Sequence, residues 1–235
     1  MIDKKNVEKA RLLYYSVLSK LFCFSYDDDR FYGLIDGLKL MLQSPLDSNS
    51  EIALRNLVES INEDYSNLSK EYDDIFHAPP NPVRTTISYY DEGYETGVAC
   101  VAIKRILAKT TIRRDESKYV ELEDNFGFIF TIMSKFIEQC IDGNEKYEEY
   151  AEELFVNYLN VFIDEFLNAI YLHEKSNFYK DIVNLMVSFF EFERAYYEVT
   201  TIESNSAIKV ADGLSRSEAA RRAKNKARKN KGVQE

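Results

Sequence analysis

Residues 125–144 read Asn-Phe-Gly-Phe-Ile-Phe-Thr-Ile-Met-Ser-Lys-Phe-Ile-Glu-Gln-Cys-Ile-Asp-Gly-Asn. Apolar side chains recur here at intervals of three and four residues, which is the period of one face of an α-helix. They are Phe126, Ile129, Phe130, Met133, Ile137 and Cys140. Asp124 or Asn125 can cap the start of this helix, and the sequence Asp142-Gly143-Asn144 is typical of a helix end. The stretch therefore predicts an amphipathic helix that packs into a helical core.

The same period continues on both sides of this stretch. It predicts further helices at about 4–24, 27–44, 48–76, 92–109, 145–173 and 177–202. Ser48 and Glu51 fit a capping box at the start of one of them. All four prolines lie in the first 82 residues, so the chain from Val83 onward lacks the residue that most reliably ends a helix. The fold class that follows is all-α.

Two segments interrupt the helical pattern. Residues 77–91 contain three prolines and are expected to form an extended loop, and a loop of this length usually has a function. Residues 110–124 lack a clear period and are expected to form a hinge. The sequence thus predicts a helical bundle in two subdomains with a basic tail. Its parts are an N-terminal subdomain 1–109, a hinge 110–124, a C-terminal subdomain 125–213 and a flexible basic tail 214–235.

Charge and cysteine usage limit the class of protein. The net charge is −10, but residues 214–235 carry eight Lys or Arg against two Glu, so the remaining 213 residues carry −16. A body this acidic repels nucleic acid and anionic membranes and attracts cationic ligands. The three cysteines are far apart, which indicates free thiols in a reducing compartment. The chain starts without an apolar leader and has no run of about 18 apolar residues, so we expect a cytoplasmic protein.

Catalytic and metal sites are poorly supported. His77 and His173 are the two histidines, too few for a di-iron bundle site, and both are expected at helix ends, where a structural role explains them. A Ser-His-Asp or Cys-His arrangement needs a histidine beside a nucleophile. The sequence has no glycine-rich phosphate loop of a known type. We therefore expect no enzyme activity, no catalytic residue, no metal site and no cofactor.

The remaining signals are recognition motifs. Glu71-Tyr72-Asp73-Asp74-Ile75-Phe76 leads into the proline loop, which ends in Ser88-Tyr89-Tyr90. Glu121-Leu122-Glu123-Asp124-Asn125 precedes Phe126-Gly127, and Phe178-Tyr179 follows an aromatic-rich helix. In order and spacing, over roughly residues 5–200, the chain resembles the TorD/DmsD family of molybdoenzyme chaperones. It departs from that family at Leu122, where proline is usual, and at Asn125, where histidine is usual. Asparagine can still cap a helix and donate a hydrogen bond.

The resemblance implies a cytoplasmic chaperone. Such proteins bind the twin-arginine signal peptide of an exported molybdoenzyme precursor and assist its cofactor loading before export. Molybdenum-cofactor biosynthesis proteins are possible further partners, DNA and a membrane span are not expected, and the protein is expected as a monomer or a domain-swapped dimer.

A peptide-binding groove is expected where the proline loop meets the hinge. An exposed arginine–carboxylate pair contributes only about 0.2–1 kcal/mol, whereas a micromolar complex needs about 8 kcal/mol. We therefore assign affinity to an apolar groove and selectivity to acidic residues at its rim. The alternative is that the aromatic residues are plain core and that the carboxylates only solvate the surface. The candidate residues are Tyr72, Asp73, Phe76, Ser88, Tyr89, Tyr90, Glu92, Glu121, Glu123, Asp124 and Asn125.

Other hypotheses remain open at this point. The chain could be a nucleotide-binding or small-molecule-binding helical protein. A ligand-sensing transcription regulator fits less well, because the basic residues lie in a tail rather than in an N-terminal helix-turn-helix. The tail itself could be a solubilising end, could fold back onto the acidic body, or could contact ribosomal RNA.

Overall fold

The computed structural model describes residues 3–24, 28–61, 64–117 and 119–202, and the predicted basic tail 214–235 lies outside them. The described segments are helical and contain no strand beyond an isolated bridge, which confirms the all-α prediction for them. The helices are α1 (Lys4–Phe22), α2 (Leu34–Leu42), α3 (Ser48–Ile61), α4 (Ser66–Phe76), α5 (Ile87–Glu92), α6 (Val98–Ala108), α7 (Phe126–Ile141), α8 (Lys146–Leu154), α9 (Asn160–Tyr171) and α10 (Phe178–Tyr196).

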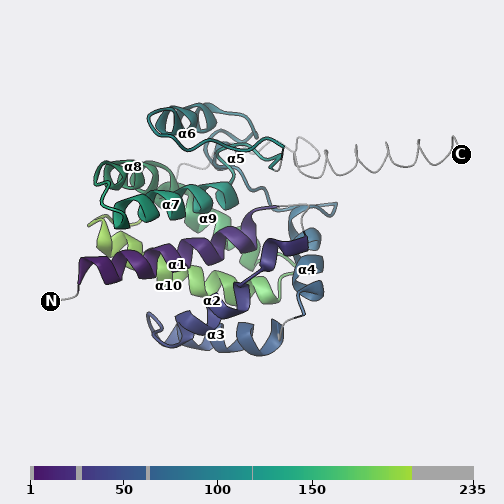
Figure 1. The fold of residues 1–235 in the computed structure, drawn as a ribbon. Coiled ribbons are helices and arrows are strands. Elements are labelled where there is room, and N and C mark those ends of the chain that lie inside the picture. The colour runs from purple at the N-terminus through teal and green to yellow at the C-terminus, as the bar shows by residue number, and fades with distance from the viewer. Residues whose placement is uncertain (1–2, 25–27, 62–63, 118, 203–235) are drawn as a thin grey trace, which may run out of the picture.

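Helix α1 lies in the middle of the bundle (Figure 1). Helix α7 packs along one side of α1, and α2 packs on another. Helix α10 packs against α3 and α9, whereas α6 lies at the outer edge next to α5 (Figure 1). A single π-helical stretch, η2 (Phe155–Leu159), joins α8 to α9 without a break, as the prediction of one long helix at 145–173 requires.

One hydrophobic core contains residues from both halves of the chain. The predicted stripe of α7 is buried in it except for Cys140, which is half-buried, so the face predicted from sequence is the face that packs. The described residues of 110–124 contain no helix and connect α6 to α7. The division into two subdomains about this segment stays a prediction.

The C-terminal end of α1 passes very close to the N-terminal end of α7. A Cβ atom placed on Gly127 would lie 2.4 Å from the backbone carbonyl carbon and oxygen of Phe22. Glycine is therefore required here by the close approach of two backbones. The crossing brings the aromatic rings of Phe22 and Phe130 to a centroid distance of 5.6 Å.

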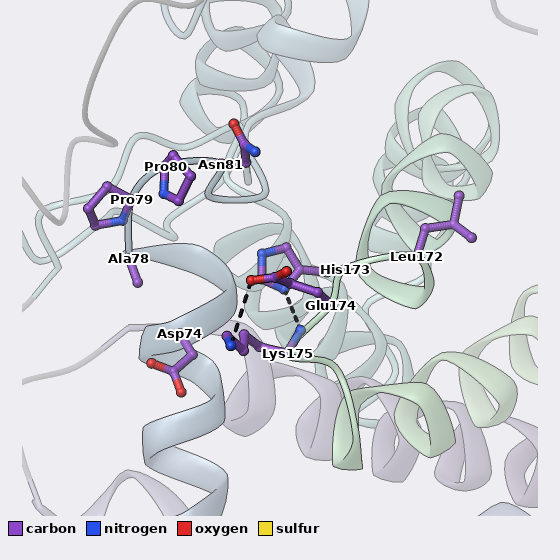
Figure 2. A pocket seen from close by; sticks show the side chains of 9 residues that line it. All are labelled: Asp74, Ala78, Pro79, Pro80, Asn81, Leu172, His173, Glu174 and Lys175. Carbon is purple, nitrogen blue, oxygen red and sulfur yellow. Dashed lines mark hydrogen bonds and ion pairs between the residues drawn. The ribbon is translucent and has the colours of Figure 1, made fainter.

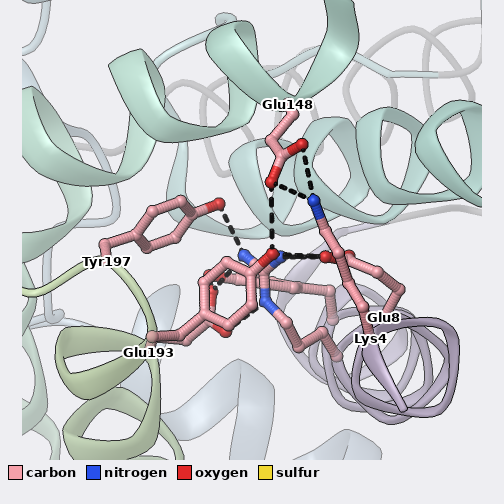
Figure 3. A network of polar contacts seen from close by, with 8 residues as sticks. Lys4, Glu8, Glu148, Glu193 and Tyr197 are labelled. Atoms are coloured by element: carbon pink, nitrogen blue, oxygen red, sulfur yellow. Dashed lines mark hydrogen bonds and ion pairs between the residues drawn. The ribbon is translucent and has the colours of Figure 1, made fainter. Parts of the chain in front are cut away.

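A buried polar network joins α1 to α10 (Figure 3). The Arg11 guanidinium donates from Nε and a terminal nitrogen to the two carboxylate oxygens of Glu193, at 2.6 and 2.9 Å. It also pairs with Glu8 at 3.1 Å and donates to the Tyr197 hydroxyl at 2.5 Å. Because Arg11, Glu8 and Glu193 are all buried, removing one partner would leave an uncompensated charge in the core. The network fixes how the first and last helices pack together.

The predicted helix at 27–44 is wrong in its first part. Residues Asp28–Phe31 form a 3-10 turn, and α2 begins only at Leu34. Gly33 lies between them with φ of 71°, a left-handed conformation that breaks the helix and that glycine adopts at no steric cost. The apolar periodicity gave no sign of this break, because it continues through the turn.

The predicted helix at 48–76 is also interrupted. Helix α3 ends at Ile61 and α4 begins at Ser66, where the Asp64 carboxylate accepts a hydrogen bond from the Ser66 N–H at 2.9 Å. At the start of α3, the Asp47 carboxylate accepts from the Ser50 N–H at 2.7 Å. The predicted capping box at Ser48 is therefore replaced by a cap at Asp47.

The proline loop is shorter than predicted. Residues 77–86 are free of helix, with a turn and bends over 77–80, but Ile87–Glu92 form α5, and the predicted helix at 92–109 begins only at Val98. The Glu92 carboxylate accepts a hydrogen bond from the Val98 N–H at 2.7 Å and so caps α6.

Among the described helices, none is both long and apolar enough to cross a membrane.

We expect Gly127→Ala to destabilise the protein by about 3 kcal/mol, because the new methyl group would collide with backbone atoms of α1 that cannot move aside cheaply. Gly37→Ala is the comparison variant, since its Cβ would meet side chains only, Val17 Cγ2 at 2.8 Å and Leu13 Cδ1 at 3.8 Å, and side chains shift more cheaply than backbone. We expect it to lower the free energy of unfolding by about 1–2 kcal/mol. Urea unfolding measures both. Equal stabilities for the two variants would contradict the close crossing.

Candidate functional site

The proline loop and the segment before α7 meet, as the sequence analysis anticipated. The Ile87 N–H donates to the Asp124 carbonyl at 2.9 Å, and the Phe126 N–H donates to the Thr85 carbonyl at 2.8 Å. Thr86 and Asn125 form an antiparallel bridge. Backbone hydrogen bonds therefore tie the end of the loop to the segment before α7.

Two side chains strengthen this junction. The Ser88 hydroxyl and backbone N–H both donate to Oδ2 of Asp124, at 2.5 and 3.1 Å. The other carboxylate oxygen of Asp124 is buried and has no hydrogen-bond partner in the described part of the chain. Burial raises the pKa of the Asp124 carboxyl above its ordinary value of 3.8, although the hydrogen bonds from Ser88 act in the opposite direction.

Asn125 caps α7, which confirms one of the two predicted caps. Its side-chain oxygen accepts hydrogen bonds from the N–H groups of Gly127 and Phe128, at 2.9 and 3.3 Å. Its side-chain nitrogen donates to the Thr85 hydroxyl at 2.8 Å. Asn125 therefore caps the helix and also binds the loop. It does so without the ionisable ring of the histidine that is usual at this position.

The predicted aromatic residues are mostly core. Tyr72, Phe76 and Tyr90 are buried, and only Tyr89 is half-exposed. The Tyr90 hydroxyl donates to the Arg84 carbonyl at 2.9 Å, which ties it to the proline loop. The three buried rings thus present no open surface. A direct peptide contact for them stays a prediction, and Tyr89 is the ring that a ligand can reach.

The predicted acidic residues already have partners within the chain. Glu123 forms ion pairs with Arg114 at 3.2 Å and with Lys104 at 3.4 Å. The Asp73 carboxylate contacts Nδ1 of His77 at 2.8 Å. Glu121 is buried, and its carbonyl accepts a hydrogen bond from Arg114 at 2.8 Å. These residues organise the junction, and their role as a rim for a cationic peptide stays a prediction.

Glu71 is a key residue that the predicted site omits. Its carboxylate accepts hydrogen bonds from the N–H groups of Asn177, Phe178 and Tyr179, at 2.7, 3.1 and 2.8 Å. These are free N–H groups at the start of α10, where a negative charge is also favoured by the helix dipole. Glu71, the first residue of one motif, therefore caps α10, the helix that begins with the Phe178-Tyr179 motif. The two motifs are separated by about a hundred positions, so the sequence carries no local sign that they pair.

A pocket of about 390 Å³ lies between the proline loop and the connection from α9 to α10. Figure 2 shows the His173 ring beside the loop, with Glu174 and Lys175 next to it and Asp74 on α4 at the edge. The pocket is lined by Asp74, Ala78, Pro79, Pro80, Asn81, Leu172, His173, Glu174 and Lys175. His173 lies at a helix end, as the sequence predicts. Nothing in the sequence indicated that residues 78–81 and 172–175 meet.

The described cysteines are free and partly or fully buried. Among the described residues, no group of three or more His, Cys, Asp or Glu side chains is placed to hold a metal ion. Cys23, Cys100 and Cys140 are free, and burial raises the pKa of the Cys23 thiol to about 12 and that of Cys100 to about 11. Such thiols stay protonated at neutral pH and are poor nucleophiles.

We expect Glu71→Ala to lower the free energy of unfolding by about 2–3 kcal/mol, because three N–H groups at the start of α10 lose their acceptor. Glu59→Ala, at an exposed position on α3, is the control and should change stability by less than about 0.5 kcal/mol. Both are measured by urea unfolding. A loss for Glu71→Ala no larger than that of the control would rule out the cap.

Asp124 should make folding depend on pH. Because its pKa is raised in the folded state, the folded protein binds its proton more tightly than the unfolded chain does. Stability should therefore fall as pH rises from the ordinary carboxyl pKa of 3.8 to the raised value, and Asp124→Asn should lack this loss. The unfolding free energy of the variant minus that of the wild type should therefore increase between pH 3.5 and 7. A difference independent of pH would contradict the raised pKa.

Comparison with known proteins identifies the family. The model of the nitrate reductase delta subunit family matches residues 43–168, which is more than half of the chain and includes α3 to α9 except for the last residues. The matched range contains the Glu71 motif, the proline loop and the capped start of α7, three of the features on which the resemblance to TorD/DmsD chaperones was based. No curated protein matches the chain. The chain belongs to the nitrate reductase delta subunit family, a family of chaperones for molybdoenzyme maturation.

Proposed function

We propose that the protein is a cytoplasmic chaperone that binds the twin-arginine signal peptide of an exported molybdoenzyme and assists cofactor loading before export. The observation that carries this proposal is the family match over residues 43–168. The charge of the body supports it, since −16 outside the basic tail favours a cationic ligand. On this proposal the protein breaks no bond, and its work is to bind and release.

The physics of such a complex limits where its affinity comes from. A twin-arginine peptide offers two guanidiniums and a modest apolar segment. Exposed charge pairs contribute about 0.2–1 kcal/mol each, so burial of the apolar segment has to supply most of the roughly 8 kcal/mol of a micromolar complex. The half-exposed ring of Tyr89, at the junction of the proline loop and the segment before α7, is a suitable surface for that segment.

The first experiment is a direct binding measurement. Molybdoenzyme leaders from the same organism, synthesised with a fluorescent label, should bind the purified protein with micromolar or tighter dissociation constants in an anisotropy titration. Raising the salt concentration from 0.05 to 0.5 M should weaken binding several-fold without abolishing it, because salt screens exposed charges but not apolar contact. Leaders of exported proteins without a molybdenum cofactor serve as controls. Failure to bind any molybdoenzyme leader would refute the proposal.

We expect Tyr89→Ala to weaken leader binding more than fivefold, since a reachable aromatic ring at an interface typically contributes over about 1 kcal/mol. Tyr32→Ala is the control, because Tyr32 is a tyrosine whose ring also reaches solvent but lies just before α2. The same anisotropy titration measures both variants. Equal affinities for the two would remove the loop junction from the binding surface.

A further inference from the structure

We infer that the pocket between the proline loop and the α9–α10 connection receives an arginine side chain of the signal peptide. This inference rests on the proposed function and adds a specific site to it. The pocket is formed by residues 78–81 on one side and 172–175 on the other, with Asp74 at its edge (Figure 2). Of these residues, none belongs to the groove predicted from sequence.

The walls of the pocket are held in position. On the loop side, the Ala78 N–H donates to the Asp73 carbonyl and the Val83 N–H donates to the Ile75 carbonyl, both at 2.9 Å. On the other side, Glu71 holds the start of α10, two residues beyond Lys175. Glu71 and Asp74 lie one turn apart on α4, so the same helix supports both walls. A pocket with fixed walls binds a side chain with little ordering cost.

The charges of the pocket suit a guanidinium. Asp74 and Glu174 supply two carboxylates, and Lys175 supplies one ammonium. The Lys175 ammonium lies 3.6 Å from the Glu174 carboxylate, whose side chain is 79% exposed. An exposed pair of this kind contributes little, so an arginine that offers two parallel N–H donors can replace the lysine at Glu174.

The apolar surfaces suit the rest of an arginine and its neighbours. Leu172 is 72% exposed, and the rings of Pro79 and Pro80 are exposed on the opposite side. Arginine packs its aliphatic stem against such surfaces while its charged head stays near carboxylates. Nδ1 of His173 accepts a hydrogen bond from the Lys175 N–H at 3.3 Å, which holds the ring beside the backbone of this wall. A volume of about 390 Å³ is near the lower end for ligand pockets, which fits one or two side chains and not a helix.

The test is leader binding by the double variant Asp74→Asn/Glu174→Gln. We expect its affinity to be about fivefold to tenfold lower than that of the wild type, as two partly exposed charge pairs would give. The matched control is Asp36→Asn/Glu59→Gln, which removes two exposed carboxylates on α2 and α3 and makes the net charge less negative by the same two units. A leader with citrulline, an uncharged isostere, in place of both arginines should bind the two double variants equally.

A second readout locates the peptide without changing charge. A benzoylphenylalanine side chain in place of Leu172 should crosslink to the leader on illumination, and the same group in place of Leu40, an exposed residue of α2, should not. If the wild type binds the leader but the pocket variant binds as tightly as the control variant, the inference is wrong and the proposed function stands. Crosslinking at position 40 and not at position 172 would also overturn it. If the wild type binds no leader, both the inference about the pocket and the proposed function are wrong.

Discussion

The close crossing at the C-terminal end of α1 is the constraint on which the rest of the fold depends. The last carbonyls of a helix have no partner within the helix and need donors from elsewhere. Here the Tyr179 hydroxyl donates to the Leu21 carbonyl at 2.6 Å, and the Tyr72 hydroxyl donates to the Phe22 carbonyl at 3.3 Å. Gly127 lets α7 pass against the same turn. Three elements that are distant in sequence thus meet at one buried helix end.

This convergence explains what the motifs of the chain do. Glu71, Tyr72, Gly127 and Tyr179 all belong to the motifs on which the family resemblance was based, and all four make or permit contacts inside the bundle. Their first role is therefore structural. They hold α4, α7 and α10 around α1, and the loops between these helices become fixed surfaces. On the proposed function, recognition would be carried by these surfaces, which the motif residues support.

The sequence predicted the helices well where periodicity and capping agree. The stripe from Phe126 to Ile137 is buried, Asn125 caps its helix, and the helix ends at Ile141, just before Asp142-Gly143-Asn144. It failed where an apolar period runs through a break, as at Gly33, because periodicity records which side chains are buried and not whether the backbone is continuous.

The binding site was harder to predict than the fold. The contact between the proline loop and the segment before α7 was anticipated, and Ser88, Asp124 and Asn125 lie in it, but a linear pattern cannot distinguish a ring that lines a groove from one that fills the core. The pocket depends on the meeting of residues 78–81 with 172–175, and that meeting is fixed by the long-range bonds of Glu71. Neither segment carries a local signal of it.

The bundle itself shows what tight binding of an arginine requires. Arg11 is buried, pairs with two carboxylates, and places its guanidinium carbon 3.9 Å from the centre of the Tyr196 ring. Such a site holds its arginine permanently, since the charge is desolvated and fully paired. The pocket by the proline loop offers carboxylates as well, but Asp74 is only partly buried and Glu174 is exposed, so each contact there would be weak and screened by water. On the proposed function the protein has to release its client for export, and a shallow, partly solvated pocket for the leader arginine would meet that requirement where a buried one would not.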